Sequence, residues 1–235
     1  MIVTSSGVVL NRIKYGESGL IVKIFTKNYG LNSFIVQGVR RKNAKLNSLL
    51  FQPFSLIKVS FYQKQNNTLN TLKEAEYSTL TDKVISDPRK TSIAAFLSEV
   101  FLNCLHENEA DLEFYEFLNH SSLLLNETQD NLRVFSPWIL LKSTKYFGFK
   151  PRFNRSSSAR FFNLQTGDFI TNQGEPNTLS ANDSDVLMGF YNASYPTNKL
   201  FHSLDLLAIA LKYYQLQNQS FRNLKTLSVL KAVFA

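Results

Sequence analysis

The chain has 235 residues, of which 44% are hydrophobic, and this is enough for a packed core and excludes disorder of the whole chain. A single cysteine excludes an intramolecular disulfide and a four-cysteine zinc site. No apolar run approaches the ~20 residues that a helix needs to cross a bilayer, and no basic stretch precedes an apolar run at Met1. We therefore expect a cytoplasmic protein without a membrane partner.

The formal net charge of +8 is unevenly distributed. Residues 1–80 contain eleven Lys and Arg against three acidic residues, a net charge of +8. Residues 81–130 carry −7 and residues 131–160 carry +7. A basic first third next to an acidic segment suggests that the first third binds a polyanion.

The first third predicts a small β-barrel. Short segments rich in Val, Ile, Phe and Tyr are separated by turn-forming residues such as "GES" and "NYG", and they show no helical periodicity. The predicted strands span residues 7–15, 19–27, 31–39, 54–64 and 68–77. Five closely spaced strands favour a five-stranded oligonucleotide-binding (OB) barrel, which closes its own edges.

A cluster of cations lies in the connection between the third and fourth predicted strands. It consists of Arg40, Arg41, Lys42 and Lys45. A fixed set of cations suits a partner with regularly spaced phosphates, because each neutralised phosphate releases counterions. The alternative is a solvated loop. The other DNA-binding candidates are Lys14, Lys23 and Lys64, with Arg12 and Lys58 extending the footprint and Tyr62 as a ring that can stack a base.

The remaining residues predict helices. Apolar residues recur at helical spacing from Ile93 to Leu105 and from Phe114 to Leu125. A third helix runs through residues 131–148, with Pro137 either starting or kinking it. Further helices are predicted around residues 200–214 and 224–234, and a hairpin turns on Thr166-Gly167. The predicted fold class is α+β multidomain: an OB barrel over residues 1–80, then a helical domain over residues 81–235 with an irregular hairpin insert around 150–180.

Signals for catalysis are weak. The three histidines are His106, His120 and His202, and Asp205 lies three residues after His202, on the same helical face. A His/Asp pair of this kind on a helix is far more often a surface contact than half of a catalytic triad. No glycine-rich phosphate loop, no G-x-S-x-G and no H-E-x-x-H motif occurs. We expect no enzymatic activity, no cofactor and no metal site.

The basic segment 131–160 has two interpretations. Apolar residues beside unopposed cations suit an acidic peptide that ends in hydrophobic side chains. In the alternative, the cations pair with the acidic segment 81–130, and the sequence does not separate the two. The candidate partner-binding residues are Trp138, Leu141, Lys142, Lys145 and Arg152.

Several short motifs, in this order and spacing, resemble the family of the DNA repair protein RecO. They are Glu17 to Ile21, Phe25-Thr26 with Gly30, Gly38 to Arg41, the "FQPF" of residues 51–54 and the "YFGFKPRF" of residues 146–153. The likeness covers nearly the whole chain and is densest over residues 8–60.

The resemblance implies an OB barrel followed by a helical domain. It also implies binding of single- and double-stranded DNA, annealing of complementary strands, and association with the nucleoid. Expected partners are RecR, the acidic, Phe-ended tail of single-strand binding protein (SSB), and indirectly the RecA recombinase, loaded onto SSB-coated DNA. Many members carry a four-cysteine zinc module after the G-x-x-P segment. This chain has no cysteine there, so we expect a zinc-free hairpin held by Phe161, Phe162 and Phe169.

Two other functions remain open at this stage. An adaptor that docks proteins and has incidental DNA affinity would keep its partners after loss of the loop cations. An RNA-binding OB protein would prefer ribose over deoxyribose.

Overall fold

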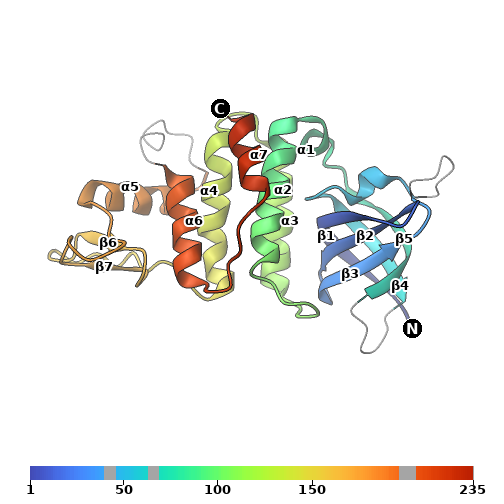
Figure 1. Ribbon diagram of the computed structural model, residues 1–235, viewed down its shortest axis with the longest axis horizontal. Coiled ribbons are helices and arrows are strands. Elements are labelled where there is room, and N and C mark those ends of the chain that lie inside the picture. The colour runs from blue at the N-terminus through green and yellow to red at the C-terminus, as the bar shows by residue number, and fades with distance from the viewer. Residues whose placement is uncertain (40–45, 63–68, 196–204, 235) are drawn as a thin grey trace. The chain divides into compact units, whose positions relative to one another are not determined.

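The computed structural model describes residues 1–39, 46–62, 69–195 and 205–234 (Figure 1). The chain forms two compact units. Unit 1 contains Met1–Thr128 and Leu224–Ala235, and unit 2 contains residues 129–223. The division at residues 80 and 81 stays a prediction about domains, and the limits of the compact units differ from it.

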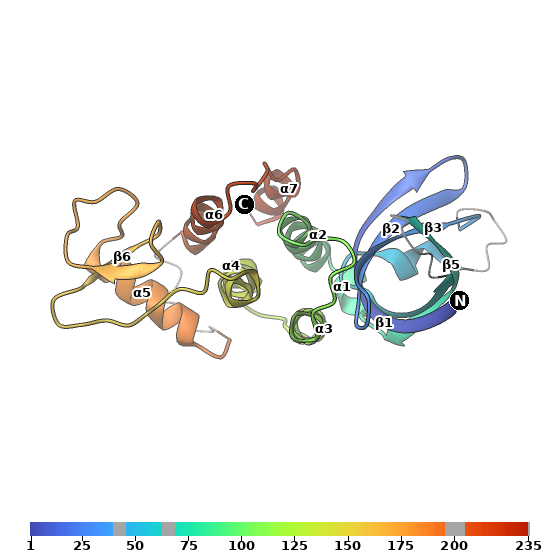
Figure 2. The ribbon, with the colours of Figure 1, turned by 90° about the horizontal axis from the view of Figure 1, so that it is seen from below.

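The predicted five-stranded barrel is confirmed. Figure 2 shows the strands closing a ring. Their order around the ring is β1-β2-β3-β5-β4. The parallel pair β3–β5 completes this ring, and the other pairs are antiparallel. The strands are β1 (Ile2–Tyr15), β2 (Gly19–Thr26), β3 (Gly30–Val36), β4 (Leu56–Tyr62) and β5 (Leu69–Thr79).

Large side chains fill the interior of the barrel. Phe34 and Phe61 are fully buried, and their ring centroids lie 4.9 Å apart in an edge-to-face arrangement, which aromatic pairs prefer. Leu20, Val22 and Ile24 share the inner face of β2, as their alternation predicts.

Strand β1 begins at Ile2, earlier than the predicted start at residue 7. Gly7 is the first residue of the predicted strand, and glycine inside a strand usually weakens it. In the structure Gly7 lies inside β1 where two strands approach closely: a Cβ there would lie 2.5 Å from the Cγ2 atom of Ile24. The glycine serves close packing and does not end the strand.

The "FQPF" motif connects the barrel to a helix. Phe51 ends the short 3-10 helix η1 (Ser48–Phe51), and both Phe51 and Phe54 are fully buried. The backbone N–H of Phe54 donates to the Val9 carbonyl at 2.7 Å, and its own carbonyl accepts a hydrogen bond from Ser122 Oγ. Ser122 belongs to helix α3 (Leu112–Glu127), so this motif fixes α3 against the barrel within unit 1.

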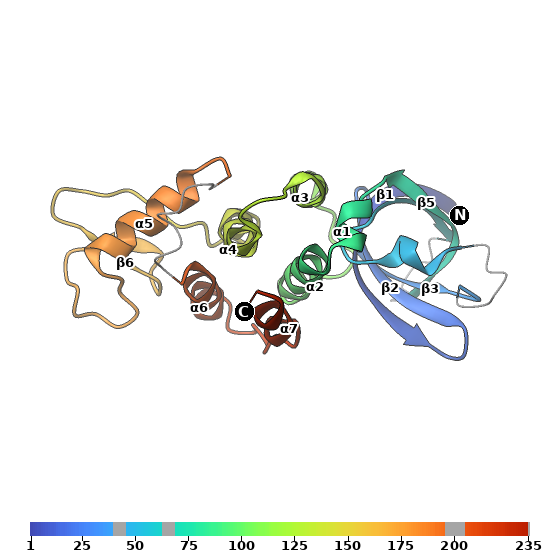
Figure 3. The same ribbon diagram turned by 90° about the horizontal axis from the view of Figure 1, so that it is seen from above.

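Four helices complete unit 1: α1 (Asp82–Ser86), α2 (Pro88–Leu102), α3 (Leu112–Glu127) and α7 (Thr226–Val233). The predicted apolar stripe of α2 is buried from Ile93 to Phe101. Phe114 of α3 contacts Phe25 of β2 and Phe101 of α2, with ring centroids 5.2 and 5.5 Å apart. Figure 3 shows α1 and α2 beside the barrel.

A carboxylate of α2 binds the start of the last helix, α7, within unit 1. Glu99 of α2 accepts hydrogen bonds from the backbone N–H groups of Lys225 and Thr226, where α7 begins. Burial disfavours the charged form of Glu99, but the hydrogen bonds from Thr226 and Lys225 outweigh it, so its pKa is lowered. A carboxylate at a helix N-terminus is favourable, and it ties the end of the chain to the helices that cover the barrel.

Unit 2 contains α4 (Leu132–Ser143), the 3-10 helix η2 (Thr144–Phe147), β6 (Phe161–Asn163), β7 (Asp168–Ile170), α5 (Ala181–Asn192) and α6 (Leu206–Gln217). Pro137 lies inside α4 and does not start it. Helices α4 and α6 are joined by the Tyr214 hydroxyl, which lies 2.7 Å from Ser143 Oγ and donates to the Leu140 carbonyl at 3.0 Å.

The predicted hairpin is present as β6–β7, with Phe161 paired to Ile170. Its core is aromatic. Phe162 lies 5.6 Å from Phe169 and 4.9 Å from Phe153, measured between ring centroids. Phe161, one of the three residues expected to hold it, is only half-buried, and Phe153 from the preceding segment takes that place.

Within the described ranges, neither a cluster of metal ligands nor a helix able to cross a membrane is found. No group of three or more His, Cys, Asp and Glu within them is arranged to hold a metal ion. None of their helices combines the length and apolar character that crossing a bilayer requires.

Gly30 provides a test of the contact between the barrel and the α2–α3 connection. Its φ of +64° is left-handed, and a Cβ there would lie 1.9 Å from the backbone oxygen of Glu109. Gly30→Ala should lower the free energy of unfolding by more than the ~1–2 kcal/mol of backbone strain alone, because the connection must move away. Urea denaturation measures this loss.

Gly16 supplies the matched control, since its φ of +57° is also left-handed but nothing lies within 4 Å of an added Cβ. Gly16→Ala should show the backbone strain only. Equal losses in the two variants would contradict the close packing at Gly30.

Candidate nucleic-acid interface

Two rows of side chains cross the outside of strands β1, β2 and β3. Cross-strand partners in a sheet share a face, and these rows alternate with the buried positions. The polar row is Asn11, Lys23 and Ser33, and the apolar row is Ile13, Ile21 and Ile35. Rows two residues apart are separated by ~7 Å along the strands. These six residues are called the outer face below.

The apolar row continues around the barrel. Ile35 pairs with Thr71, Thr71 pairs with Tyr62, and Tyr62 pairs with Ile2. Three of the large side chains on the outside of the barrel are well exposed: Ile13 at 52%, Tyr15 at 50% and Tyr62 at 44%. Exposed rings such as Tyr15 and Tyr62 offer a flat face on which an unstacked base can stack, and Ile13 adds apolar surface. The predicted Tyr62 is thus accessible.

The polar row is engaged with an acidic residue. The ammonium of Lys23 lies 2.9 Å from Glu107 Oε1, and Ser33 Oγ donates to the same oxygen at 3.0 Å. Glu107 belongs to the connection between α2 and α3, where the backbone N–H of Asn108 donates to the Leu31 carbonyl at 2.8 Å. Lys23, a predicted DNA contact, is therefore paired within the protein.

The remaining cations of β1 differ in role. Lys14 is exposed near the β1–β2 turn. Arg12 is half-buried, and its Nη1 donates to the Ser48 carbonyl at 2.8 Å. Burial lowers the pKa of the Arg12 guanidinium. Arg12 therefore holds the start of η1, while Lys14 is accessible to a ligand.

The basic connection itself lies outside the described residues, as does Lys64. Its two flanks are described: Val39 is 4% exposed in the barrel core, and Leu46 packs against that core. The roles of Arg40, Arg41, Lys42, Lys45 and Lys64 stay predictions, and these flanks connect them to the barrel.

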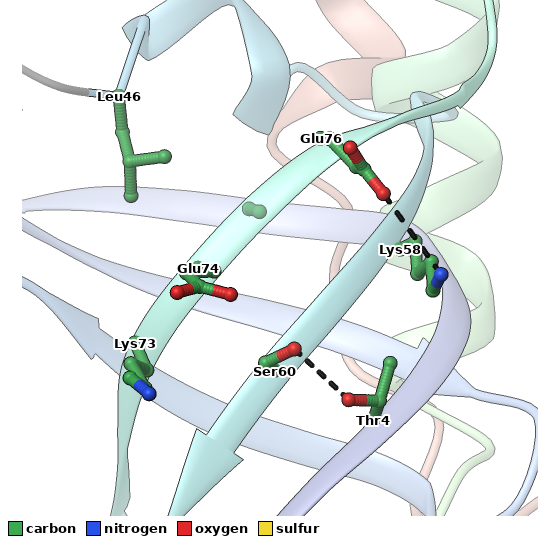
Figure 4. Close-up of a pocket in the computed structure, with 8 residues that line it drawn as sticks. Thr4, Leu46, Lys58, Ser60, Lys73, Glu74 and Glu76 are labelled. Carbon is green, nitrogen blue, oxygen red and sulfur yellow. Dashed lines mark hydrogen bonds and ion pairs between the residues drawn. The ribbon is translucent and has the colours of Figure 1, made fainter.

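A hollow of about 460 Å³ lies on the β4–β5 side of the barrel (Figure 4). Its lining mixes both charges, and Lys58 lies 4.0 Å from Glu76 across the two strands. Thr4 and Ser60 share a hydrogen bond of 2.9 Å. Because Lys58 faces a carboxylate, this side suits a polyanion less well than the neighbourhood of Lys14.

Ion pairs are described for residues of both the acidic segment 81–130 and the basic segment 131–160. Glu107 and Glu116 of the acidic segment pair with Lys23 and Lys27 of the barrel, each at 2.9 Å. Arg152 pairs with Asp168 at 2.9 Å, and Arg155 pairs with Asp185. Both interpretations of the basic segment stay predictions.

The candidate partner-binding residues of unit 2 divide into buried and accessible groups. Leu141 and Trp138 are 1% and 8% exposed and lie in the core. The ammonium of Lys142 lies 5.5 Å from the Trp138 ring centroid and 5.0 Å from that of Tyr191. Burial, and then the charge of Lys145, lower the pKa of Lys142. Lys145 and Arg152 are exposed.

Sequence reasoning did not identify Ser33, Glu107 or the isoleucine row as parts of one surface. Strand alternation carried a signal for the row, since Ile21 and Lys23 share the outer side of β2. No local signal places Glu107 against Lys23, because the two are 84 positions apart.

Comparison with known families gives matches along most of the chain. Residues 1–80 match the model "Recombination protein O N terminal", and residues 85–189 match "Recombination protein O C terminal". Similar proteins include those named DNA repair protein RecO from Flavobacterium psychrophilum at 30% identity, Bacteroides fragilis at 28% and Christiangramia forsetii at 27%. Each alignment covers 100% of both chains.

The two family models match in the expected order, and the barrel and helices lie where these matches fall. The chain belongs to the RecO family of DNA repair proteins.

Proposed function

We propose that the protein is a non-enzymatic DNA-binding protein of recombinational repair that anneals complementary strands. In this proposal it helps to load RecA onto SSB-coated DNA together with RecR. One observation carries the proposal: the large side chains of Ile13, Tyr15 and Tyr62 are exposed on the outside of the barrel, within the part of the chain that holds a net charge of +8.

The chemistry of annealing is compatible with such a surface. Two strands repel each other through their phosphates, and cations that neutralise phosphates remove this barrier without any bond being made or broken. Rings and branched side chains hold unstacked bases with little regard to sequence. Double-stranded DNA offers phosphates but no open base faces, so we expect the cations alone to bind it.

Three of the described cations on the barrel already contact groups of the protein itself. Lys23 is paired with Glu107, Lys58 faces Glu76, and Arg12 holds η1. Lys14 is exposed. The proposal therefore assigns the main neutralising role to Arg40, Arg41, Lys42 and Lys45.

For the protein partners, the surface around α4 and α5 is the candidate for the acidic, Phe-ended tail of SSB. Lys142 lies over Trp138 and Tyr191. Its pKa is lowered by burial and then by repulsion from Lys145. A carboxylate placed there would relieve this repulsion, while the half-buried ring of Tyr191 would contact an apolar residue. Leu141 is buried, so in this proposal it supports α4 from the core.

Replacing Arg40, Arg41 and Lys42 together by Ala tests the basic connection. Affinity for any oligonucleotide should fall, and the slope of log affinity against log salt should flatten by about 2 if each cation neutralises one phosphate of a single strand. Fluorescence anisotropy over a salt series measures both quantities.

Lys58→Ala is the control for this series, because Lys58 faces Glu76 in the hollow. It should leave the slope nearly unchanged. A triple variant with the wild-type slope would remove the basic connection from the binding site. Tighter binding of RNA than of DNA of the same sequence would favour the RNA-binding alternative.

The SSB proposal is tested with a peptide that carries the acidic, Phe-ended tail. Binding to the full-length protein should change the fluorescence of Trp138, the single tryptophan, and Lys142→Met with Lys145→Met should weaken binding at least tenfold. The lowered pKa of Lys142 also means that this ammonium loses its charge earlier than an ordinary lysine as pH rises. Peptide affinity should fall over that range.

The full chain is used because unit 1 contains residues from both sides of position 81. Lys150→Met removes one positive charge from an exposed lysine of the same unit and serves as the control for a general loss of positive charge. Equal affinity of the double variant and the wild type would contradict docking at this surface.

A further inference from the structure

We propose that Lys23 and Ser33 form an anion site for one phosphate of a bound single strand, and that Glu107 occupies this site in the protein without DNA. The inference rests on the proposed DNA binding and adds to it an internal competitor. By competing with the phosphate, Glu107 lowers the affinity of the barrel for a single strand.

The geometry of the site is that of a bound anion. One carboxylate oxygen of Glu107 accepts from both the Lys23 ammonium, at 2.9 Å, and the Ser33 hydroxyl, at 3.0 Å. These two donors lie directly opposite each other on β2 and β3. A phosphate oxygen can accept the same two hydrogen bonds, since a charged donor next to a hydroxyl suits either anion.

The site is reachable from outside. The side chains of Lys23 and Glu107 are 36% and 31% exposed. Ser33 is only 7% exposed, so a phosphate would reach its hydroxyl only after the Glu107 side chain has left. The backbone next to Glu107 is fixed by the hydrogen bond from the Asn108 N–H to the Leu31 carbonyl. Exchange of the carboxylate for a phosphate therefore requires rotation of the Glu107 side chain, and the connection between α2 and α3 stays in place.

The surroundings match a single strand better than a free anion. Ile21 and Ile35 lie two residues further along the same strands, ~7 Å from Lys23 and Ser33. A phosphate in the anion site would place the attached base near this apolar row. A duplex keeps its base faces stacked, so the competition should be stronger for single strands.

The expected size of the effect is modest. Partly exposed ion pairs contribute little free energy, so removal of the competitor should raise single-strand affinity by roughly two- to fivefold. One additional neutralised phosphate should also steepen the salt slope by about 0.7.

The experiment titrates a fluorescent oligothymidylate with the full-length wild type, Glu107→Gln, Lys23→Met and the double variant. Glutamine keeps an oxygen that can accept from Ser33, and a thermal melt checks that the fold is retained. Glu107→Gln should bind two- to fivefold more tightly with a steeper salt slope, and the gain should vanish when Lys23 is Met. The matched control is Glu109→Gln, which removes the same charge from an exposed position in the same connection.

A gain of the same size in Glu109→Gln, or a gain that persists in the Lys23→Met background, would overturn the inference, because general charge would then explain it. No gain in Glu107→Gln, with normal DNA binding by the wild type, would overturn the inference and leave the proposed function standing. No binding by any of the proteins would overturn both.

Discussion

The closed barrel forces alternate side chains of each strand to opposite sides, and the rest of the structure depends on this constraint. Phe34, Phe61 and Val22 fill the interior, so their sequence neighbours Ser33, Ile35 and Lys23 must lie on the outside. The short parallel pairing of β3 with β5 completes the ring. The outer face is thereby fixed by the same packing that stabilises the fold.

The outside of the barrel is not uniformly available. Helix α3 covers Phe25 at the end of β2 through Phe114, and the acidic connection before α3 engages Lys23. Part of the net charge of +8 in residues 1–80 is thus balanced within unit 1 by an acidic segment that is distant in sequence. Affinity for a polyanion follows from the cations that remain exposed, so net charge alone overestimates it.

Local patterns predicted the five strands, the buried stripe of α2 and the β6–β7 hairpin, because alternation, helical spacing and turn chemistry act over a few residues. The start of β1 was missed because Gly7 fits a close strand contact that sequence does not display. The Glu107–Lys23 pair and the return of α7 to Glu99 join residues 84 or more positions apart, and only tertiary folding creates them. Leu141 was a candidate partner-binding residue, but tertiary packing buries it within unit 2, and the local sequence does not reveal this packing.

The central claim is that the outside of β1, β2 and β3 holds the bases of a single strand, and Ile13→Glu tests it most directly. Ile13 is 52% exposed, so glutamate should leave the melting temperature nearly unchanged. Leu80→Glu, at a residue 66% exposed, introduces the same charge elsewhere in unit 1. In an oligothymidylate titration, the account predicts that Ile13→Glu loses at least tenfold in affinity while Leu80→Glu loses little. Equal affinities of the two variants would contradict it.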